Sequence, residues 1–199
     1  MKKLLTLSAL ILSAALVFMG CQQPEVDTDP YGDCKDTVNS VVLSDGIWSV
    51  NSKGRSTMFN RFSGDMEFNA KATAANGDYN YTSGTMKFVM KTSDILGDSY
   101  SQFTALPADQ KEQFYNQYTT GMKTVFENYI GTVTNAKMDE NNLTINVTLN
   151  ETMLANTKQG MSLTSFSSGT TIKTNSNKTK YIINTKIDNR DITIKLSKD

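Results

Sequence analysis

The stretch DMEFNAKA, residues 65–72, alternates polar and apolar side chains without a break. In an extended chain, successive side chains point to opposite faces, so Met66, Phe68, Ala70 and Ala72 share one face. The intervening charged and amide side chains share the other face, which water can reach. The pattern therefore predicts a half-buried β-strand.

A tight turn follows this strand. Asn76 and Gly77 both tolerate the positive φ angles that a type I′ turn requires, and Tyr79 and Tyr81 then begin another alternating run. We expect a β-hairpin with its turn at these two residues.

The second strand of this hairpin changes phase. Its later apolar residues, Met86, Phe88 and Met90, are even-numbered, whereas the two tyrosines are odd-numbered. A period of two cannot change phase unless one residue is added, so we expect a β-bulge near Ser83 and Gly84, which would bend the sheet.

Further strands alternate in the same way after residue 140. Short polar linkers, DENN (139–142) and DNRD (188–191), indicate that strands adjacent in sequence pair antiparallel. The apolar positions of these strands are Leu143, Ile145, Val147 and Leu149; Tyr181, Ile183, Thr185 and Ile187; and Ile192, Ile194 and Leu196.

One segment has helical periodicity instead. From Pro107 to about residue 130, apolar residues recur at intervals of three and four, which predicts a long amphipathic helix. A second, shorter helix is expected around 150–158.

Together, these strands and helices predict the fold class of the chain. It is predicted to be mainly β (α+β), an antiparallel barrel or strongly curved sheet of about eight or nine strands. We expect the helix near 107–130 to pack on the outside of that sheet or across its open end.

The N-terminus has the pattern of an export signal. Two lysines precede an apolar run that ends near Phe18 and is short for a membrane span, which needs about 20 residues. The sequence Phe18-Met19-Gly20-Cys21 resembles the lipobox of bacterial lipoproteins, in a relaxed form similar to that of spirochaetes. The resemblance implies cleavage before Cys21 and lipidation of its thiol.

These patterns divide the chain into three parts. We expect a lipoprotein signal peptide at 1–20, a flexible acidic tether at 21–40, and a single β domain at 41–199. The second cysteine, Cys34, falls in the expected tether and would be an odd thiol, because a lipidated Cys21 cannot form a disulfide with it. By resemblance, the absence of an acidic residue at Gln22 favours the outer membrane of the cell envelope.

The single tryptophan supplies another resemblance. In DGIWSV (45–50), Gly46 and Trp48 are similar to the Gly-x-Trp that opens the first strand of lipocalin-like barrels. That resemblance implies that Trp48 closes one end of a barrel and that Arg190, at the start of the last strand, packs over it. A lone core tryptophan in any β domain is the alternative.

Large flexible and aromatic side chains on the apolar faces suggest a binding cavity. Methionine adapts to irregular shapes and tyrosine adds a polar group, so these residues could line a site for a small apolar or amphipathic ligand. They could equally fill a plain core. The candidate ligand-binding residues are Met66, Phe68, Tyr79, Tyr81, Met86, Phe88 and Met90.

The residue inventory argues against an enzyme. The chain has no histidine, which excludes histidine-based nucleophilic catalysis and the usual zinc sites. It also has no Ser-x-x-Lys and no glycine-rich phosphate loop. We therefore predict no catalytic residue, no metal site and no cofactor. From Cys21 onward there are 18 basic and 20 acidic side chains, so no nucleic-acid binding is expected.

Two functions remain after these exclusions. The first is a lipid-anchored lipoprotein whose β domain binds a small apolar or amphipathic ligand. The alternative is a surface-displayed structural or interaction protein, antigen-like or adhesin-like, with a filled core and no ligand.

Overall fold

The computed structural model describes residues 29–59, 62–187 and 189–199. Contacts divide the chain into two units, Met1–Gly32 and Asp33–Asp199. Residues 29–32 of the first unit form a turn in which the Gly32 N–H donates to the Asp29 carbonyl oxygen at 3.0 Å. The expected signal peptide and the lipobox with Cys21 lie outside the described residues. Within the described ranges, no helix combines the length and apolar character needed to cross a membrane.

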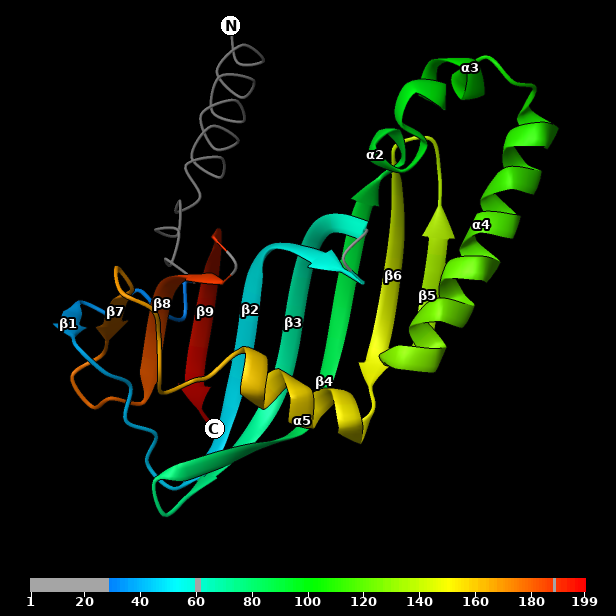
Figure 1. Ribbon diagram of the computed structural model, residues 1–199. Coiled ribbons are helices and arrows are strands. Elements are labelled where there is room, and N and C mark those ends of the chain that lie inside the picture. Colours follow the sequence, from blue (N-terminus) through cyan, green and yellow to red (C-terminus); the bar gives the residue numbers. More distant parts are fainter. Residues whose placement is uncertain (1–28, 60–61, 188) are drawn as a thin grey trace, which may run out of the picture. The chain divides into compact units, whose positions relative to one another are not determined.

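The second unit is built on one antiparallel sheet of nine strands. The sheet order is β1-β7-β8-β9-β2-β3-β4-β6-β5 (Figure 1). The strands are β1 (Asp36–Val38), β2 (Gly46–Met58), β3 (Phe62–Ala75), β4 (Asp78–Lys91), β5 (Gly131–Met138), β6 (Asn142–Leu149), β7 (Thr171–Thr174), β8 (Lys180–Ile187) and β9 (Arg190–Lys198). The mainly β class predicted from the sequence is therefore confirmed.

The sheet is open, so the barrel alternative is wrong. Strands β1 and β5 lie at opposite edges of the sheet, and within the described ranges no ladder joins them. The central pair is β2 with β9, which joins the N-terminal and C-terminal groups of strands. A barrel would need a further ladder between these two edge strands. Strand β1 has only three residues, so it is too short to form an extended ladder.

The β3–β4 hairpin has the predicted turn and bulge. Asn76 and Gly77 adopt φ angles of 55° and 80°, as a two-residue type I′ turn requires. The register then shifts: Ala72 pairs with Tyr81 but Lys71 pairs with Ser83, which leaves Thr82 as the extra residue. Thr82 directly precedes the pair at which the change of phase located the bulge.

The two faces of the sheet differ sharply in polarity. On β2, Trp48 and Val50 are buried, and the alternate residues face solvent. The solvent face carries a polar network in which Lys71 forms an ion pair with Asp199 and Lys53 forms one with Glu67. The core therefore lies on one face alone, under the helices and loops that cover it.

Helix α4 (Ala108–Tyr129) occupies the range expected for the long helix. It packs beside β5 at one edge of the sheet (Figure 1), and its Phe126 ring lies 6.0 Å from that of Phe88 on β4. Only Met122 and Phe126 of this helix are buried, and Tyr129 is 66% exposed. The expected amphipathic face is therefore narrow, and it covers one edge rather than the whole sheet.

Shorter helices connect the remaining strands. Between β4 and α4 lie α2 (Thr92–Leu96), the 3-10 turn η1 (Gly97–Ser99) and α3 (Tyr100–Thr104). After β6, α5 (Glu151–Gly160) lies across the apolar face of the sheet (Figure 1). Its N-cap is Asn150, whose side-chain oxygen accepts from the Met153 N–H at 2.7 Å.

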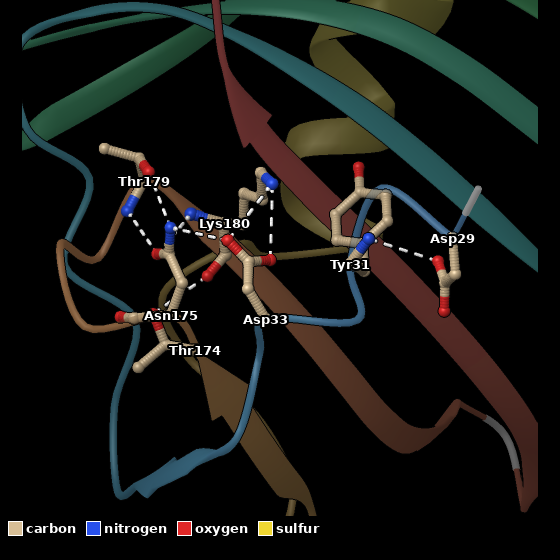
Figure 2. A network of polar contacts seen from close by, with 7 residues as sticks. All are labelled: Asp29, Tyr31, Asp33, Thr174, Asn175, Thr179 and Lys180. Atoms are coloured by element: carbon tan, nitrogen blue, oxygen red, sulfur yellow. Dashed lines mark hydrogen bonds and ion pairs between the residues drawn. The ribbon is translucent and has the colours of Figure 1, made fainter. Parts of the chain in front are cut away.

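The folded unit begins within the segment expected to be tether. Strand β1 pairs with β7, and Cys34 just before it is buried, with 6% of its surface exposed. Figure 2 shows how this segment is held: the Lys180 ammonium donates to both carboxylate oxygens of Asp33 at 3.2 Å, and Asn175 lies alongside. The boundary of the β unit therefore lies at Asp33 rather than at residue 41.

Candidate functional site

A concavity in the second unit lies between α5 and the apolar face of the sheet. We call it the α5 pocket; its volume is about 200 Å³. Residues from β2, β3, β4, β6, β8, β9 and α5 contribute to it. Its lining consists of Ser52, Arg55, Ser56, Met58, Met66, Phe68, Met86, Leu149, Met153, Thr157, Gly160, Met161, Ile187, Arg190 and Ile192.

Methionine dominates this lining. Five of the ten methionines in the chain surround the pocket: Met58, Met66, Met86, Met153 and Met161. Their unbranched thioether side chains change shape at little energetic cost, so such a surface can adapt to apolar molecules of different outline. The pocket is thus apolar and deformable rather than rigidly shaped.

A buried hydroxyl lies in this apolar surface without a partner. Ser52 is fully buried, and its Oγ has no hydrogen-bond partner within the described structure. An unpaired buried hydroxyl costs about 1–3 kcal/mol, so natural cores rarely keep one unless something else satisfies it. A polar atom of a bound molecule that reached this Oγ would be a hydrogen-bond partner for it.

Two arginines belong to the lining, but Arg55 is exposed, has the parity of the solvent face of β2 and also lines a hollow on the polar face. Arg55 on β2 forms an ion pair with Asp94 at 3.4 Å, whereas Arg190 at the start of β9 is half-buried. No acidic side chain belongs to the lining as described. The pocket therefore combines an apolar interior with one half-buried cation, Arg190, the arrangement expected for an amphipathic ligand.

The structure divides the candidate ligand residues into two groups. Met66, Phe68 and Met86 line the α5 pocket, as a binding role requires. Phe88 and Met90 instead belong to the plain core: Phe88 is fully buried against Phe126 of α4, and Met90 is 2% exposed.

Tyr79 and Tyr81 also lie in the core, close to each other but outside the pocket lining. The Tyr79 hydroxyl accepts a hydrogen bond from the Leu163 N–H at 2.9 Å, which ties the segment after α5 to β4. The Tyr81 hydroxyl is buried and has no partner within the described structure. Burial, with a smaller contribution from Tyr79, raises the pKa of Tyr81 far above its usual range.

The expected packing of Arg190 over Trp48 does not occur. Trp48 pairs with Lys198 at one end of β9, and Arg190 lies at the other end, eight residues away along that strand. At about 3.3 Å per residue, the two are separated by roughly 26 Å of strand. Trp48 instead donates from its indole nitrogen to the Ser44 carbonyl at 2.9 Å and packs on Tyr181.

Several pocket residues escaped the sequence analysis. Met153 and Met161 belong to the α5 region, where the apolar pattern is weak, and Met58 and Ser52 interrupt no visible motif. Only Ser52 and Met58 have a signal in the sequence, because both have the even numbering of the buried face of β2. Nothing in the sequence shows that α5 would lie over that face.

A second hollow, of about 370 Å³, lies on the polar face and includes Lys53, Glu67 and Lys87 in its lining. Its charged groups are largely paired, as in the Lys53–Glu67 ion pair at 3.4 Å. Among the described residues, no group of three or more Cys, Asp or Glu side chains is arranged to hold a metal ion.

Comparison with known proteins found no match. No protein-family model matches this chain, and no curated protein or solved structure has significant similarity to it.

Proposed function

We propose that this protein is a lipid-anchored lipoprotein of a bacterial envelope and that its β unit binds a small apolar or amphipathic ligand beneath α5. The observation that carries the ligand proposal is the methionine-lined α5 pocket with the unpartnered Ser52 hydroxyl inside it. Apolar walls provide affinity through burial of ligand surface, and a few polar groups fix orientation.

The size of the pocket selects a suitable test ligand. An apolar cavity of ~150 Å³ holds one benzene molecule, which has six heavy atoms. By proportion, the α5 pocket of about 200 Å³ accepts roughly eight heavy atoms. Octan-1-ol, an uncharged molecule with an alkyl chain of about that size, is a suitable probe. We expect calorimetric titration to detect its binding to the full chain carrying Cys21→Ala, purified without detergent.

A matched pair of variants locates the binding. Ser56 is half-buried and lines the pocket, whereas Thr73 is exposed on the polar face of β3. Ser56→Phe should fill the pocket and abolish octanol binding, and Thr73→Phe should leave binding unchanged. Native mass spectrometry of the purified chain adds an independent readout, because a natural ligand would appear as an added mass. Absence of octanol binding together with a clean apo mass would contradict the proposed function.

The lipid anchor rests on the lipobox sequence at Phe18–Cys21. Several acyl chains on Cys21 would hold the protein firmly, since each buried methylene contributes about 0.8 kcal/mol, whereas one chain holds it only reversibly. Cys21→Ala should move the protein from the membrane fraction to the soluble fraction. Cys34→Ala is the matched control and should leave it in the membrane fraction.

The competing function, interaction through the surface, is favoured by one exposed aromatic group. Phe59 and Tyr129 are 39% and 66% exposed, and their ring centroids lie 5.6 Å apart at the C-terminal end of α4. Tyr129→Ser should not alter octanol binding if ligand binding is the function of the α5 pocket. If the pocket stays empty under all conditions, this aromatic group becomes the leading candidate for function.

A further inference from the structure

We infer that the α5 pocket selects a single-chain carboxylic acid of medium length, and that Arg190 binds its carboxylate. This inference rests on the proposed function and specifies its ligand class. Its basis is the distribution of charge and of existing ion pairs around the pocket.

The two arginines of the lining are not equivalent. The Arg55 side chain is 56% exposed and already forms an ion pair with Asp94 at 3.4 Å. Within the described structure, Arg190 has no hydrogen-bond or ion-pair partner that would compensate its charge. The neighbouring Asp191 is instead paired with Lys186 at 3.4 Å. Among the residues that the structure describes, Arg190 is therefore the cation of the pocket that remains available to a ligand.

The position of Arg190 directs it to the apolar face. Arg190 has the same parity on β9 as Ile192 and Ile194, which are both buried on that face. It is half-buried at the β8–β9 end of the pocket, where it shares the lining with Ile187 and Ile192. A partly buried charge is stabilised by an opposite charge, and the planar guanidinium matches a carboxylate with two parallel hydrogen bonds.

The number of charges favours a carboxylate over a phosphate. One unpaired arginine matches one negative charge, whereas a phosphate monoester carries about −1.5 to −2 at pH 7. The apolar volume beneath α5 limits the rest of the ligand to roughly eight heavy atoms, and the methionines allow some variation in chain shape. These limits together describe an alkyl carboxylate such as octanoate.

Calorimetric titrations of the full chain carrying Cys21→Ala test this inference with four probes. We expect octanoate to bind roughly tenfold or more tightly than octan-1-ol, because a charge-assisted hydrogen bond is stronger than a neutral one. Octylamine should bind more weakly than octanol, since its cation faces Arg190. Octyl phosphate should bind no more tightly than octanoate.

Substitutions at the two arginines assign the carboxylate site. Arg190→Gln should reduce octanoate affinity to that of octanol and leave octanol affinity unchanged, whereas Arg190→Lys should keep part of the gain. Arg55→Gln should keep the preference for octanoate. Loss of that preference in Arg55→Gln, but not in Arg190→Gln, would overturn the assignment of Arg190.

Failure of this inference is distinguishable from failure of the proposed function. If octanoate and octanol bind with equal affinity, the pocket binds apolar ligands without selecting an acid, and only the further inference is overturned. If neither binds, the proposed function fails as well.

Discussion

Tyr79 and Leu163 are joined by a buried hydrogen bond in which the Leu163 backbone N–H donates to the Tyr79 hydroxyl at 2.9 Å. Tyr79 lies early in β4, and Leu163 follows α5 at 0% exposure. This contact fixes the chain that leaves α5 against the sheet, so it helps to hold the cover of the α5 pocket in place.

Tyr79→Phe should destabilise the protein by about 1–3 kcal/mol, because the Leu163 N–H would remain buried without an acceptor. The ring itself is retained, and with it the contact of the Lys158 ammonium 5.1 Å from the ring centroid. The change in the free energy of unfolding can be measured by urea denaturation.

Tyr81→Phe is the matched control from the same strand. The two rings lie 5.7 Å apart, but the Tyr81 hydroxyl is buried without a partner in the described structure. Removal of this hydroxyl should leave the free energy of unfolding unchanged or raise it, because an unsatisfied polar atom disappears. Equal destabilisation by both substitutions would contradict the hydrogen-bond assignment.

Gly131 should be intolerant of any side chain. It joins α4 to β5, and a Cβ there would overlap the Thr148 carbonyl oxygen and lie 2.9 Å from the Asn150 nitrogen. We expect Gly131→Ala to destabilise the protein by roughly 2 kcal/mol or more through displacement of the β5–β6 ladder.

Gly121 offers the opposite case within α4. A Cβ there meets nothing within 4 Å, and the position is exposed. Gly121→Ala should therefore stabilise the protein by about 0.5–1 kcal/mol through higher helix propensity. Thermal denaturation of the two variants should shift in opposite directions.

Local features of this fold could be predicted from the sequence because short-range chemistry determines them. The turn at Asn76 and Gly77 follows from residues that accept positive φ, and the bulge at Thr82 follows from the change of phase along β4. Each requires only a few neighbouring residues.

The strand order could not be predicted in this way. The pairing of β2 with β9 joins residues such as Val50 and Leu196, which are far apart in the chain. Alternation shows which face of a strand is buried but not which strand lies beside it. A closed barrel and an open sheet therefore have the same sequence pattern.

The candidate site was predictable only where β3 and β4 contribute to it. Met66, Phe68 and Met86 follow from alternation on β3 and β4, and all three line the pocket. The cover of the pocket depends on α5: Met153 in this helix and Met161 directly after it line the pocket only because the chain turns back after β6. Such tertiary placement leaves no local signature in a short helix.

Asn150 should control both the stability of α5 and ligand binding. Its side-chain oxygen accepts from the Met153 N–H at 2.7 Å, and Met153 lines the α5 pocket. Asn150→Ala should destabilise the protein by about 1 kcal/mol and weaken octanol binding. Asn150→Asp should preserve both properties, because aspartate is an equally good N-cap and its charge suits the helix N-terminus. Stability would be measured by urea denaturation and binding by calorimetry.

Asp33 should make stability depend on pH in the acid range. Partial burial would raise the pKa of its carboxyl, but the hydrogen bonds and charge of Lys180 outweigh that effect and lower the pKa below its ordinary value of 3.8. A carboxyl whose pKa is lower in the folded state binds protons more readily in the unfolded state. Its contribution is therefore fully present well above pH 3.8 and is lost as the pH falls through the folded value.

Asp33→Asn isolates this contribution, because it removes the charge while keeping a similar shape. Urea denaturation of both proteins should show the largest difference in stability near pH 6, and the difference should shrink as the pH falls below 3.8. High salt should reduce the difference at pH 6, since 51% of the Asp33 side chain is exposed and its ion pair is screened. A difference that stays constant from pH 6 to pH 3 would show that the Asp33–Lys180 ion pair contributes no pH-dependent stability.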